Sequence, residues 1–359
     1  MAFDFPSTPS IGQVANGYVW DGEKWLSEGS PVPVVAVKKN YIINGAMQVS
    51  QENGTATGTA NNYYPADQFY ISQNMGANVS INQVASVTPG GSPNRIRYTI
   101  GTPADASVAI GDVVVIGHMI EGLRVADLLM GSASAKTITL AFGVKAPAGT
   151  FCVALRNSAT NRNYVAEYVI SSGEANTDVR KTVTIALDQS GTWLKDNGAG
   201  VCVTWALMCG TTYQGAANTW QAGNLLATSN QFNLCAATGN TFELFDVGLY
   251  EGLAPPFVVP DYASELALCQ RYFVSETLGT CFFLSIEHTS AYRSLNIKFP
   301  VEMRSNPAVT GVFGVSASWL GGYPTIVDTS RWGFNARGDC TPATTAYSYI
   351  SSYKANARL

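Results

Sequence analysis

The segment Lys136–Lys145, K-T-I-T-L-A-F-G-V-K, decides the fold class of this 359-residue chain. Its large apolar residues stand at every second position: Ile138, Leu140, Phe142 and Val144. That spacing is the period of a β-strand with one buried face. The segments 183–187, 201–207 and 295–299 repeat it with β-branched and aromatic residues, which favour strands. We therefore predict an all-β protein.

Helical spacing occurs in only two short places, Glu121–Met130 and Ser264–Arg271. The strand-like segments elsewhere are separated by Gly, Asn, Ser and Asp, the residues of turns. Many short strands with turns between them are typical of β-sandwiches and barrels.

Composition divides the chain into three parts. At about 150 residues per domain, its length predicts two or three domains. Residues 1–39 are rich in Pro and Gly, and residues 40–252 hold the longest series of alternating strands. Leu253–Pro256 is the predicted linker, because proline cannot donate to a β-ladder and stiffens the chain. Residues 261–359 open with the short helix and return to strands.

Charge excludes several kinds of protein. Only 13% of residues are charged, against roughly 25% in an average soluble protein, and the net charge is −4. A nucleic-acid binder needs clustered Lys and Arg to neutralise phosphates, so none is expected here.

No segment is long and apolar enough for a membrane-spanning helix, and Met1–Pro6 does not resemble a secretory signal. We expect a protein made in the cytosol that does not insert into membranes.

The seven cysteines have no spacing typical of zinc or redox sites. They are Cys152, Cys202, Cys209, Cys235, Cys269, Cys281 and Cys340. Their number is odd and no C-x-x-C or C-x-x-H pair occurs, so buried, reduced thiols and no metal site are predicted.

No catalytic motif is found. The two histidines, His118 and His288, lie in strand-like segments, where a hydrogen-bonded structural imidazole is the expected role. Nucleophile-elbow, zinc-protease and phosphate-loop motifs are missing. A carboxylate pair assembled by the fold stays open, because such pairs leave no sequence signature. Its candidates are Glu167, Glu243, Glu251 and Glu287, each of which also fits a charge at a strand edge. We predict no catalytic residue and no enzyme.

Aromatic residues are abundant, with 7 Trp and 17 Tyr. Flat, rigid rings stack on the apolar faces of sugars and dominate protein interfaces. Five of them stand near turn-like segments and are the predicted glycan- or receptor-binding residues: Tyr213, Trp220, Trp319, Tyr323 and Trp332. Trp193 and Trp205 lie beside or within strands and are predicted to belong to the core.

The first 25 residues carry a recognisable motif. Phe5-Pro6-Ser7-Thr8-Pro9-Ser10-Ile11-Gly12-Gln13, followed by Tyr18-Val19-Trp20-Asp21-Gly22-Glu23-Lys24-Trp25, resembles the start of bacteriophage tail-fibre and related virion appendage proteins. Asp-Gly between two aromatic strands favours a tight hairpin. The resemblance implies a short module that attaches the chain to the virion. Its attachment residues are Phe5, Pro6, Gln13, Trp20, Asp21, Gly22 and Trp25.

Further motifs lie in the other two parts. Asn40–Met47, Tyr64–Phe69, Ile120–Gly122, Thr139–Lys145 and, more loosely, Phe245–Gly252 are similar to segments of the same family. They imply a central jelly roll like that of carbohydrate-binding modules. Glu265-Leu266-Ala267-Leu268-Cys269-Gln270-Arg271-Tyr272-Phe273 and Phe299-Pro300-Val301-Glu302-Met303-Arg304-Ser305-Asn306-Pro307 resemble the family's C-terminal motifs. Arg271 and Arg304 are interpreted as structural pairs or subunit contacts.

Together these features predict a tail fibre or head fibre. It would have a virion-attachment module at 1–39, a jelly roll at 40–252 and a β-sandwich tip at 261–359. The resemblance implies a homotrimer, bound to other virion proteins through residues 1–39 and to host cell-surface polysaccharide through its tip. Two alternatives stay open: a purely structural collar or capsid decoration protein, and a glycan depolymerase. No cofactor is predicted, although jelly rolls often bind structural calcium.

Overall fold

The computed structural model describes residues 5–10, 12–20, 24–27, 38–285, 291–315, 324–340 and 346–359. The chain forms two compact units, residues 1–39 and 40–359.

The first unit contains one small antiparallel sheet. Its strands are β1 (Val14–Ala15), β2 (Tyr18–Trp20) and β3 (Trp25–Ser27). Trp20 pairs with Trp25 across the hairpin, and Phe5 stacks on Trp25 with 4.7 Å between ring centroids. None of the described residues between 5 and 27 is buried. This unit has no hydrophobic core among those residues.

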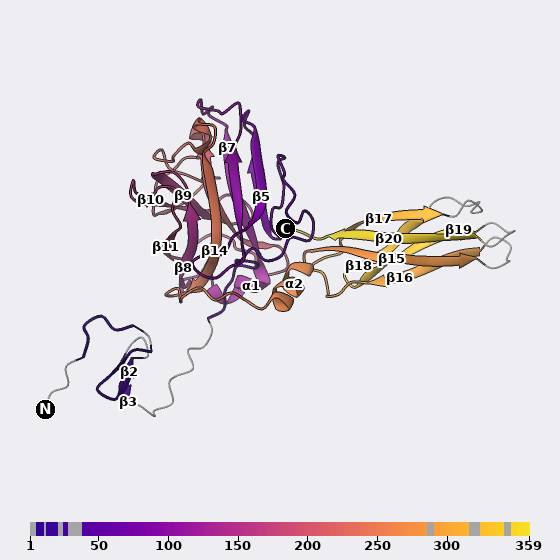
Figure 1. The fold of residues 1–359 in the computed structure, drawn as a ribbon, viewed down its shortest axis with the longest axis horizontal. Helices are drawn as coiled ribbons and strands as arrows, with labels where there is room; N and C mark the ends of the chain where they lie inside the picture. Colours follow the sequence, from indigo (N-terminus) through magenta and orange to yellow (C-terminus); the bar gives the residue numbers. More distant parts are fainter. Residues whose placement is uncertain are drawn as a thin grey trace. The chain divides into compact units, whose positions relative to one another are not determined.

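The second unit begins with a two-layer sandwich (Figure 1). The first sheet has six strands in the order β13-β10-β9-β12-β7-β4, each antiparallel to its neighbours. In chain order these are β4 (Phe69–Gln73), β7 (Val113–Glu121), β9 (Gly149–Arg156), β10 (Asn163–Ile170), β12 (Ala199–Cys209) and β13 (Trp220–Gln221).

The second sheet has five strands in the order β11-β8-β14-β6-β5, also antiparallel. They are β5 (Val79–Ala85), β6 (Asn94–Ile100), β8 (Thr137–Lys145), β11 (Val179–Ala186) and β14 (Thr241–Glu251). Strands distant in the sequence are neighbours in both sheets, which is the arrangement of a jelly roll.

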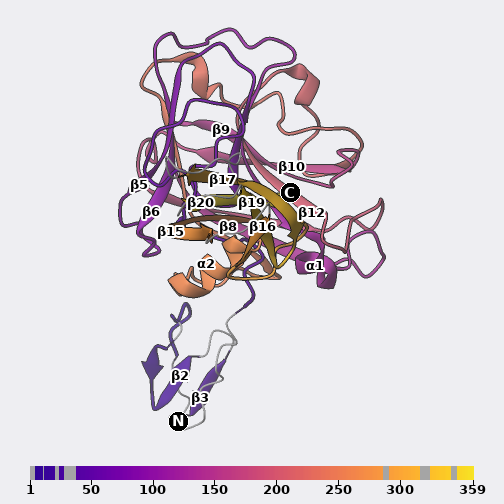
Figure 2. The same ribbon diagram turned by 90° about the vertical axis from the view of Figure 1, so that its right-hand side faces the viewer.

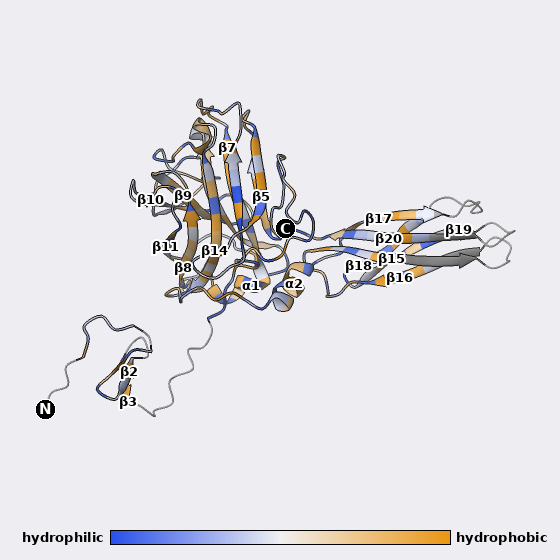
Figure 3. Ribbon diagram, viewed as in Figure 1, coloured by the Kyte–Doolittle hydropathy of each residue, from blue (hydrophilic) through white to orange (hydrophobic). Residues whose placement is uncertain are grey.

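The main core fills the space between these sheets. Ile138, Leu140, Phe142 and Val144 of β8 all belong to it, as their period of two predicted. Trp205 is fully buried and Trp193 is 6% exposed, so both are core residues as predicted. Hydrophobic and hydrophilic residues alternate over Val79–Asn82 of β5 (Figure 3), and burial goes on alternating as far as Val84. The prediction of an all-β jelly-roll sandwich is confirmed.

Helices are few and short. The first predicted helical segment contains α1 (Gly122–Val125) and the 3₁₀ turn Ala126–Leu128. The second contains α2 (Tyr262–Gln270), which Figure 2 shows as the longer helix. Its N-cap Asp261 accepts a hydrogen bond from the Ser264 amide. Among the described residues, no helix has the length and apolar character needed to cross a bilayer.

The C-terminal strands form two three-stranded sheets, β15-β20-β17 and β16-β19-β18. Their bounds are β15 (Phe273–Ser285), β16 (Ala291–Lys298), β17 (Ala308–Val315), β18 (Thr325–Ser330), β19 (Gly333–Cys340) and β20 (Ala346–Asn356). Both sheets contribute to one small core that includes Ile297, Phe334 and Tyr353. A separate domain at 261–359 stays a prediction, because residues 40–359 form one compact unit.

Polar contacts, some of them buried, join the sandwich to the C-terminal part. Glu121 of β7 accepts two hydrogen bonds from Arg271, at 2.8 and 2.6 Å, and one from the Tyr272 hydroxyl at 2.8 Å. Arg304 donates to the carbonyl oxygens of Asn197 and Ala357 at 2.6 and 2.8 Å. Both motif arginines therefore make contacts within the chain, one of the two roles expected for them.

Five cysteine side chains are buried and unbridged: Cys152, Cys202, Cys209, Cys235 and Cys269. The side chains of Cys281 and Cys340 lie outside the described part of the structure.

Candidate functional site

The outer face of the six-stranded sheet, the face opposite the main core, carries the candidate site. On β4, Phe69 and Ile71 enter the core, so Tyr70 between them faces the other way. Tyr70 pairs with Gly117 of β7, where a Cβ atom would lie 2.2 Å from the Tyr70 Cζ atom. Glycine at 117 therefore lets the tyrosine ring lie close against the sheet.

A second aromatic ring extends this surface. Tyr64 lies beside Tyr70, with 6.1 Å between ring centroids. The Arg358 guanidinium stacks on Tyr64, 3.8 Å from its centroid, and on Phe273 at 3.9 Å. Arg358 also forms an ion pair with Glu52 at 2.5 Å. The C-terminal segment is thus fixed at the edge of this sheet face.

A small hollow lies between these groups. It is lined by Tyr64, Gln68, Tyr70, Met119, Arg358 and Leu359. Three of these side chains hold buried polar atoms without a hydrogen-bond partner: Gln68 Nε2, the Tyr70 hydroxyl, and Arg358 Nε and Nη2. Gln68 is 6% exposed and Tyr70 is 7% exposed. Unpaired buried polar groups each cost about 1–3 kcal/mol, so their gathering in one hollow indicates a place for a binding partner or ordered water.

Arg156 and Asn163 form the next part of the face, where β9 pairs with β10. Arg156 Nη1 donates to the side-chain oxygen of Asn224, and its Nε is buried without a partner. Asn163 donates to the carbonyl oxygens of Gln221 and Gly223 at 3.2 and 2.6 Å, which leaves its buried Oδ1 without a donor. The segment 210–232 therefore forms the rim on this side.

The Tyr70 hydroxyl stays protonated and neutral, mainly because it is buried. Burial raises the pKa of Tyr70 to about 12, and Cys202 adds to the rise, while the Arg156 guanidinium opposes it. Tyr70 therefore presents a neutral hydroxyl at physiological pH, able both to donate and to accept a hydrogen bond.

The predicted binding residue Tyr213 lies on this same face, near the end of the sheet. It packs against a second apolar cluster, which lies on this face and includes Val113, Val115 and Cys152. Further along the face, Glu167 accepts hydrogen bonds from the Thr228 hydroxyl and from Asn230, the latter at 3.0 Å. These contacts fix the segment 210–232 over the sheet.

Trp220 lies elsewhere, at the edge where the two sheets meet. Its Nε1 donates to the carbonyl oxygen of Ala186 at 2.8 Å, and its ring contacts Trp193 and Tyr164. Trp332 is 61% exposed in the turn between β18 and β19. The structure therefore does not bring the predicted binding aromatics together. Trp319 and Tyr323 fall outside the described residues.

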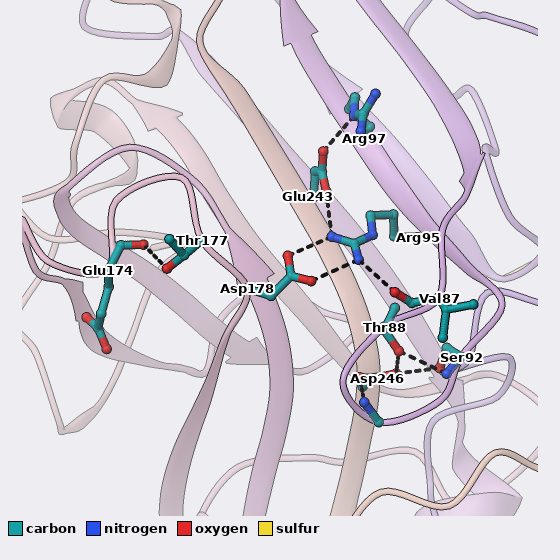
Figure 4. A network of polar contacts seen from close by, with 11 residues as sticks. Val87, Thr88, Ser92, Arg95, Arg97, Glu174, Thr177, Asp178, Glu243 and Asp246 are labelled. Carbon is teal, nitrogen blue, oxygen red and sulfur yellow. Dashed lines mark hydrogen bonds and ion pairs between the residues drawn. The ribbon is translucent and has the colours of Figure 1, made fainter.

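The outer face of the five-stranded sheet differs, because its charges neutralise one another (Figure 4). Arg95 donates to Asp178 at 2.7 and 3.0 Å and to Glu243 at 2.8 Å, and Arg97 donates to Glu243 at 2.6 Å. Beside this network, the Asp246 carboxylate accepts hydrogen bonds that fix the turn 88–92. These groups already have partners within the chain.

The candidate catalytic groups have structural contacts. His118 is fully buried, its Nε2 lies 3.0 Å from the Ile43 carbonyl oxygen, and burial lowers its pKa to about 4. Glu251 pairs with Lys136 at 2.8 Å, and the contacts of Glu167 and Glu243 are given above. His288 and Glu287 lie outside the described residues. Within the described ranges, no group of three or more His, Cys, Asp or Glu side chains is arranged to hold a metal ion.

Only part of the predicted attachment set lies in the described residues. Phe5, Pro6, Gln13, Trp20 and Trp25 are described, whereas Asp21 and Gly22 are not. Gln13 accepts a hydrogen bond from the Ser10 amide at 2.9 Å, and Trp20 contacts Trp25 with 5.6 Å between ring centroids. The predicted hairpin pairing of β2 with β3 is observed.

Sequence reasoning missed Tyr70, Gln68, Arg156 and Asn163. Tyr64–Phe69 was recognised only as a family motif with a core aromatic residue. The sequence does contain a signal for Tyr70. Side chains alternate along a strand, so a core position for Phe69 and Ile71 places Tyr70 on the opposite face. Nothing local in the sequence indicates that Arg156 lacks an acidic partner.

Comparisons with known proteins give weak structural likenesses. One solved structure with a similar part is an arabinose-bound α-L-arabinofuranosidase, with 10% identity and a TM-score of 0.32 over 66% of this chain and 30% of that chain. A second is the enzymatically active domain of bacteriophage CBA120 tailspike protein 4, with 9% identity and a TM-score of 0.31 over 59% of this chain and 21% of that chain. A third is a putative sugar-binding protein from Bacteroides thetaiotaomicron, with 11% identity and a TM-score of 0.32 over 60% of this chain and 100% of that chain. The chain spans less than a third of the length of the first two structures. Likenesses with such TM-scores identify no shared ligand or activity.

No protein-family model matches the chain, and no curated protein matches its sequence.

Proposed function

We propose that this chain is a non-enzymatic virion appendage protein that binds a saccharide on the outer face of its six-stranded sheet. The observation that carries saccharide binding is the set of buried polar atoms without partners beside two aromatic rings. These atoms belong to Gln68, Tyr70, Arg156 and Asn163, and the rings are those of Tyr64 and Tyr70. Sugar hydroxyls both donate and accept hydrogen bonds, and sugar C–H faces stack on aromatic rings.

The virion role is supported by the motifs at residues 5–25, 40–47, 265–273 and 299–307. The described residues between 5 and 27 contain half-exposed aromatic contacts and no buried side chain. Such a small unit gains stability by packing against another surface. We propose that residues 1–39 supply this attachment to other virion proteins.

A homotrimer fits the same role. Linked copies of a weak site raise avidity by roughly 10²–10⁴ without any new contact, provided that the sites can engage together. Polysaccharides repeat their units and so offer such sites. We propose a homotrimer located in the virion and bound to host cell-surface polysaccharide.

Binding is favoured over cleavage by the pairing of Glu243 and Glu251 with basic side chains. A retaining or inverting glycosidase needs two carboxylates with their oxygens available to substrate. A depolymerase would release reducing ends from host polysaccharide, which a reducing-sugar assay measures.

The second candidate function is a purely structural collar or capsid decoration protein. The described residues between 5 and 27 contain no buried side chain, which supports attachment to another surface but indicates no ligand. This observation therefore favours a structural protein as much as a receptor-binding one. Such a protein would bind no saccharide, and imaging of intact particles would show it packed among other virion proteins.

A glycan array probed with the full chain tests saccharide binding. We expect binding to at least one saccharide and its loss in Tyr70→Ala. Tyr262→Ala is the matched control, because Tyr262 is a 54% exposed tyrosine on α2. No binding by the folded chain, or binding that Tyr70→Ala leaves intact, would refute this site.

A further inference from the structure

Arg156 is a half-buried arginine that has neither an ion pair nor a full set of backbone partners, unlike Arg304, which donates to three carbonyl oxygens. Five other partly or fully buried arginines form ion pairs with carboxylates: Arg95, Arg97, Arg162, Arg271 and Arg358. The polar contacts of Arg156 are with two neutral side chains, those of Asn224 and Tyr70. Within the described residues, Arg156 has no acidic partner.

The position of Arg156 makes this isolation costly. Arg156 is half-buried and its Nε is buried without a partner. Removing charge from water without pairing it is unfavourable, and the cost is recovered when an anion approaches. A guanidinium has a planar fork of donors that matches the two oxygens of a carboxylate. Its surroundings therefore favour a carboxylate from outside the chain.

Neighbouring groups suit the rest of an acidic sugar. Asn163 lies opposite Arg156 on β10, where its buried side chain holds the segment 221–223 beside the site. The nearby Tyr70 has a neutral hydroxyl beside the Arg156 guanidinium, so it does not compete with an anion for that charge. Glu167, the acidic residue four positions beyond Asn163 on β10, already bonds Thr228 and Asn230.

We propose that the outer face of the six-stranded sheet binds a carboxylate-bearing saccharide, with the acidic group paired to Arg156. This specificity rests on the saccharide-binding function proposed above. Arg358 has a different role, because its charge is already paired with Glu52. It supports Tyr64 at the edge of the site.

The test compares each acidic polymer with its own neutral form. The full chain is titrated calorimetrically with polygalacturonate, alginate and polysialate, and with the carboxyl-reduced product of each. We expect at least one acidic polymer to bind and its reduced form to bind at least about tenfold more weakly, as the loss of a charge-assisted contact predicts. This comparison uses the unaltered chain, so it does not depend on the folding of a variant.

Variants then assign the carboxylate to Arg156. Arg156→Gln should weaken binding of the acidic polymer at least about tenfold and leave binding of the reduced form within about twofold. Arg180→Gln is the control for net charge, since Arg180 is exposed on β11 of the opposite sheet, and it should change affinity by less than about twofold. Circular dichroism confirms that each variant is folded.

The outcomes separate the two proposals. Equal binding of acidic and reduced forms, lost in Tyr70→Ala, would overturn the preference for acidic saccharides and keep saccharide binding. An equal loss of affinity in Arg156→Gln and Arg180→Gln would show a general charge effect and overturn the pairing with Arg156. Failure to bind any of these polymers would overturn the preference, and failure on a broad glycan array would overturn saccharide binding as well.

Discussion

Replacing Glu121 by glutamine should weaken the junction between the sandwich and the C-terminal strands. The Glu121 side chain is 3% exposed and accepts three hydrogen bonds, two from Arg271 and one from Tyr272. Glutamine has nearly the same shape but carries no charge and offers one acceptor oxygen. The amide would also place an NH₂ group against the donors of Arg271.

The expected loss follows from burial. Removing one partner of a fully buried ion pair costs about 3–5 kcal/mol. The Arg271 side chain is 28% exposed, so water can solvate part of its charge. Glutamine also keeps one hydrogen bond. We therefore expect Glu121→Gln to lower the free energy of unfolding by about 2–3 kcal/mol.

Urea unfolding, followed by circular dichroism, measures this loss. The matched control is Glu251→Gln, which breaks a pair whose side chains are 50% and 33% exposed and should cost less than about 1 kcal/mol. A double-mutant cycle with Arg271→Met isolates the pairwise energy. If Glu121→Gln is no more destabilising than Glu251→Gln, the argument that this contact holds the junction together is wrong.

Three further predictions concern the sandwich. Gly117→Ala should force the Tyr70 ring off the sheet and lower the free energy of unfolding, measured in urea, by about 1–3 kcal/mol. It should also abolish saccharide binding, and an unchanged affinity would show that the position of the Tyr70 ring does not matter for binding. The pKa of His118 falls from about 6.5 to about 4 on folding, so protonation at low pH favours the unfolded state. We expect the free energy of unfolding to show no His118 penalty above pH 6.5 and to fall by up to about 3 kcal/mol towards pH 4. His118→Phe should remove that part of the pH dependence in urea titrations, and an unchanged slope would assign it to other groups. Trp220→Phe should lose the bond to Ala186 and about 1 kcal/mol of stability, with unchanged affinity on the glycan array; weaker binding would return Trp220 to the site.

Hydrophobic periodicity predicted the sandwich because each buried strand repeats its signal locally. In β8 every second residue enters the core, and no knowledge of the partner strands is needed to see it. The pairing of strands is different. Nothing in the sequence near β14 indicates that β8 and β6 are its neighbours, since pairing depends on contacts between distant segments.

The candidate site was poorly predictable for the same reason. Tyr213 was selected for its turn-like surroundings, and it does lie on the outer face of the six-stranded sheet. Trp220 was selected by the same rule, yet it packs at the edge between the sheets. Arg156 becomes informative only when the structure shows which acidic side chains are within reach. A missing partner is a property of three-dimensional neighbours and leaves no mark in the sequence.

The ion network on the five-stranded sheet has a consequence for behaviour on warming. Hydration of charged groups becomes less favourable as temperature rises, so the penalty for keeping Arg95 and Glu243 away from water shrinks with heat. Apolar burial gains no comparable benefit. We expect the loops fixed by Arg95 to keep their amide protons protected close to the melting temperature. The opposite sheet, where several outer polar atoms lack partners, should be the first to open.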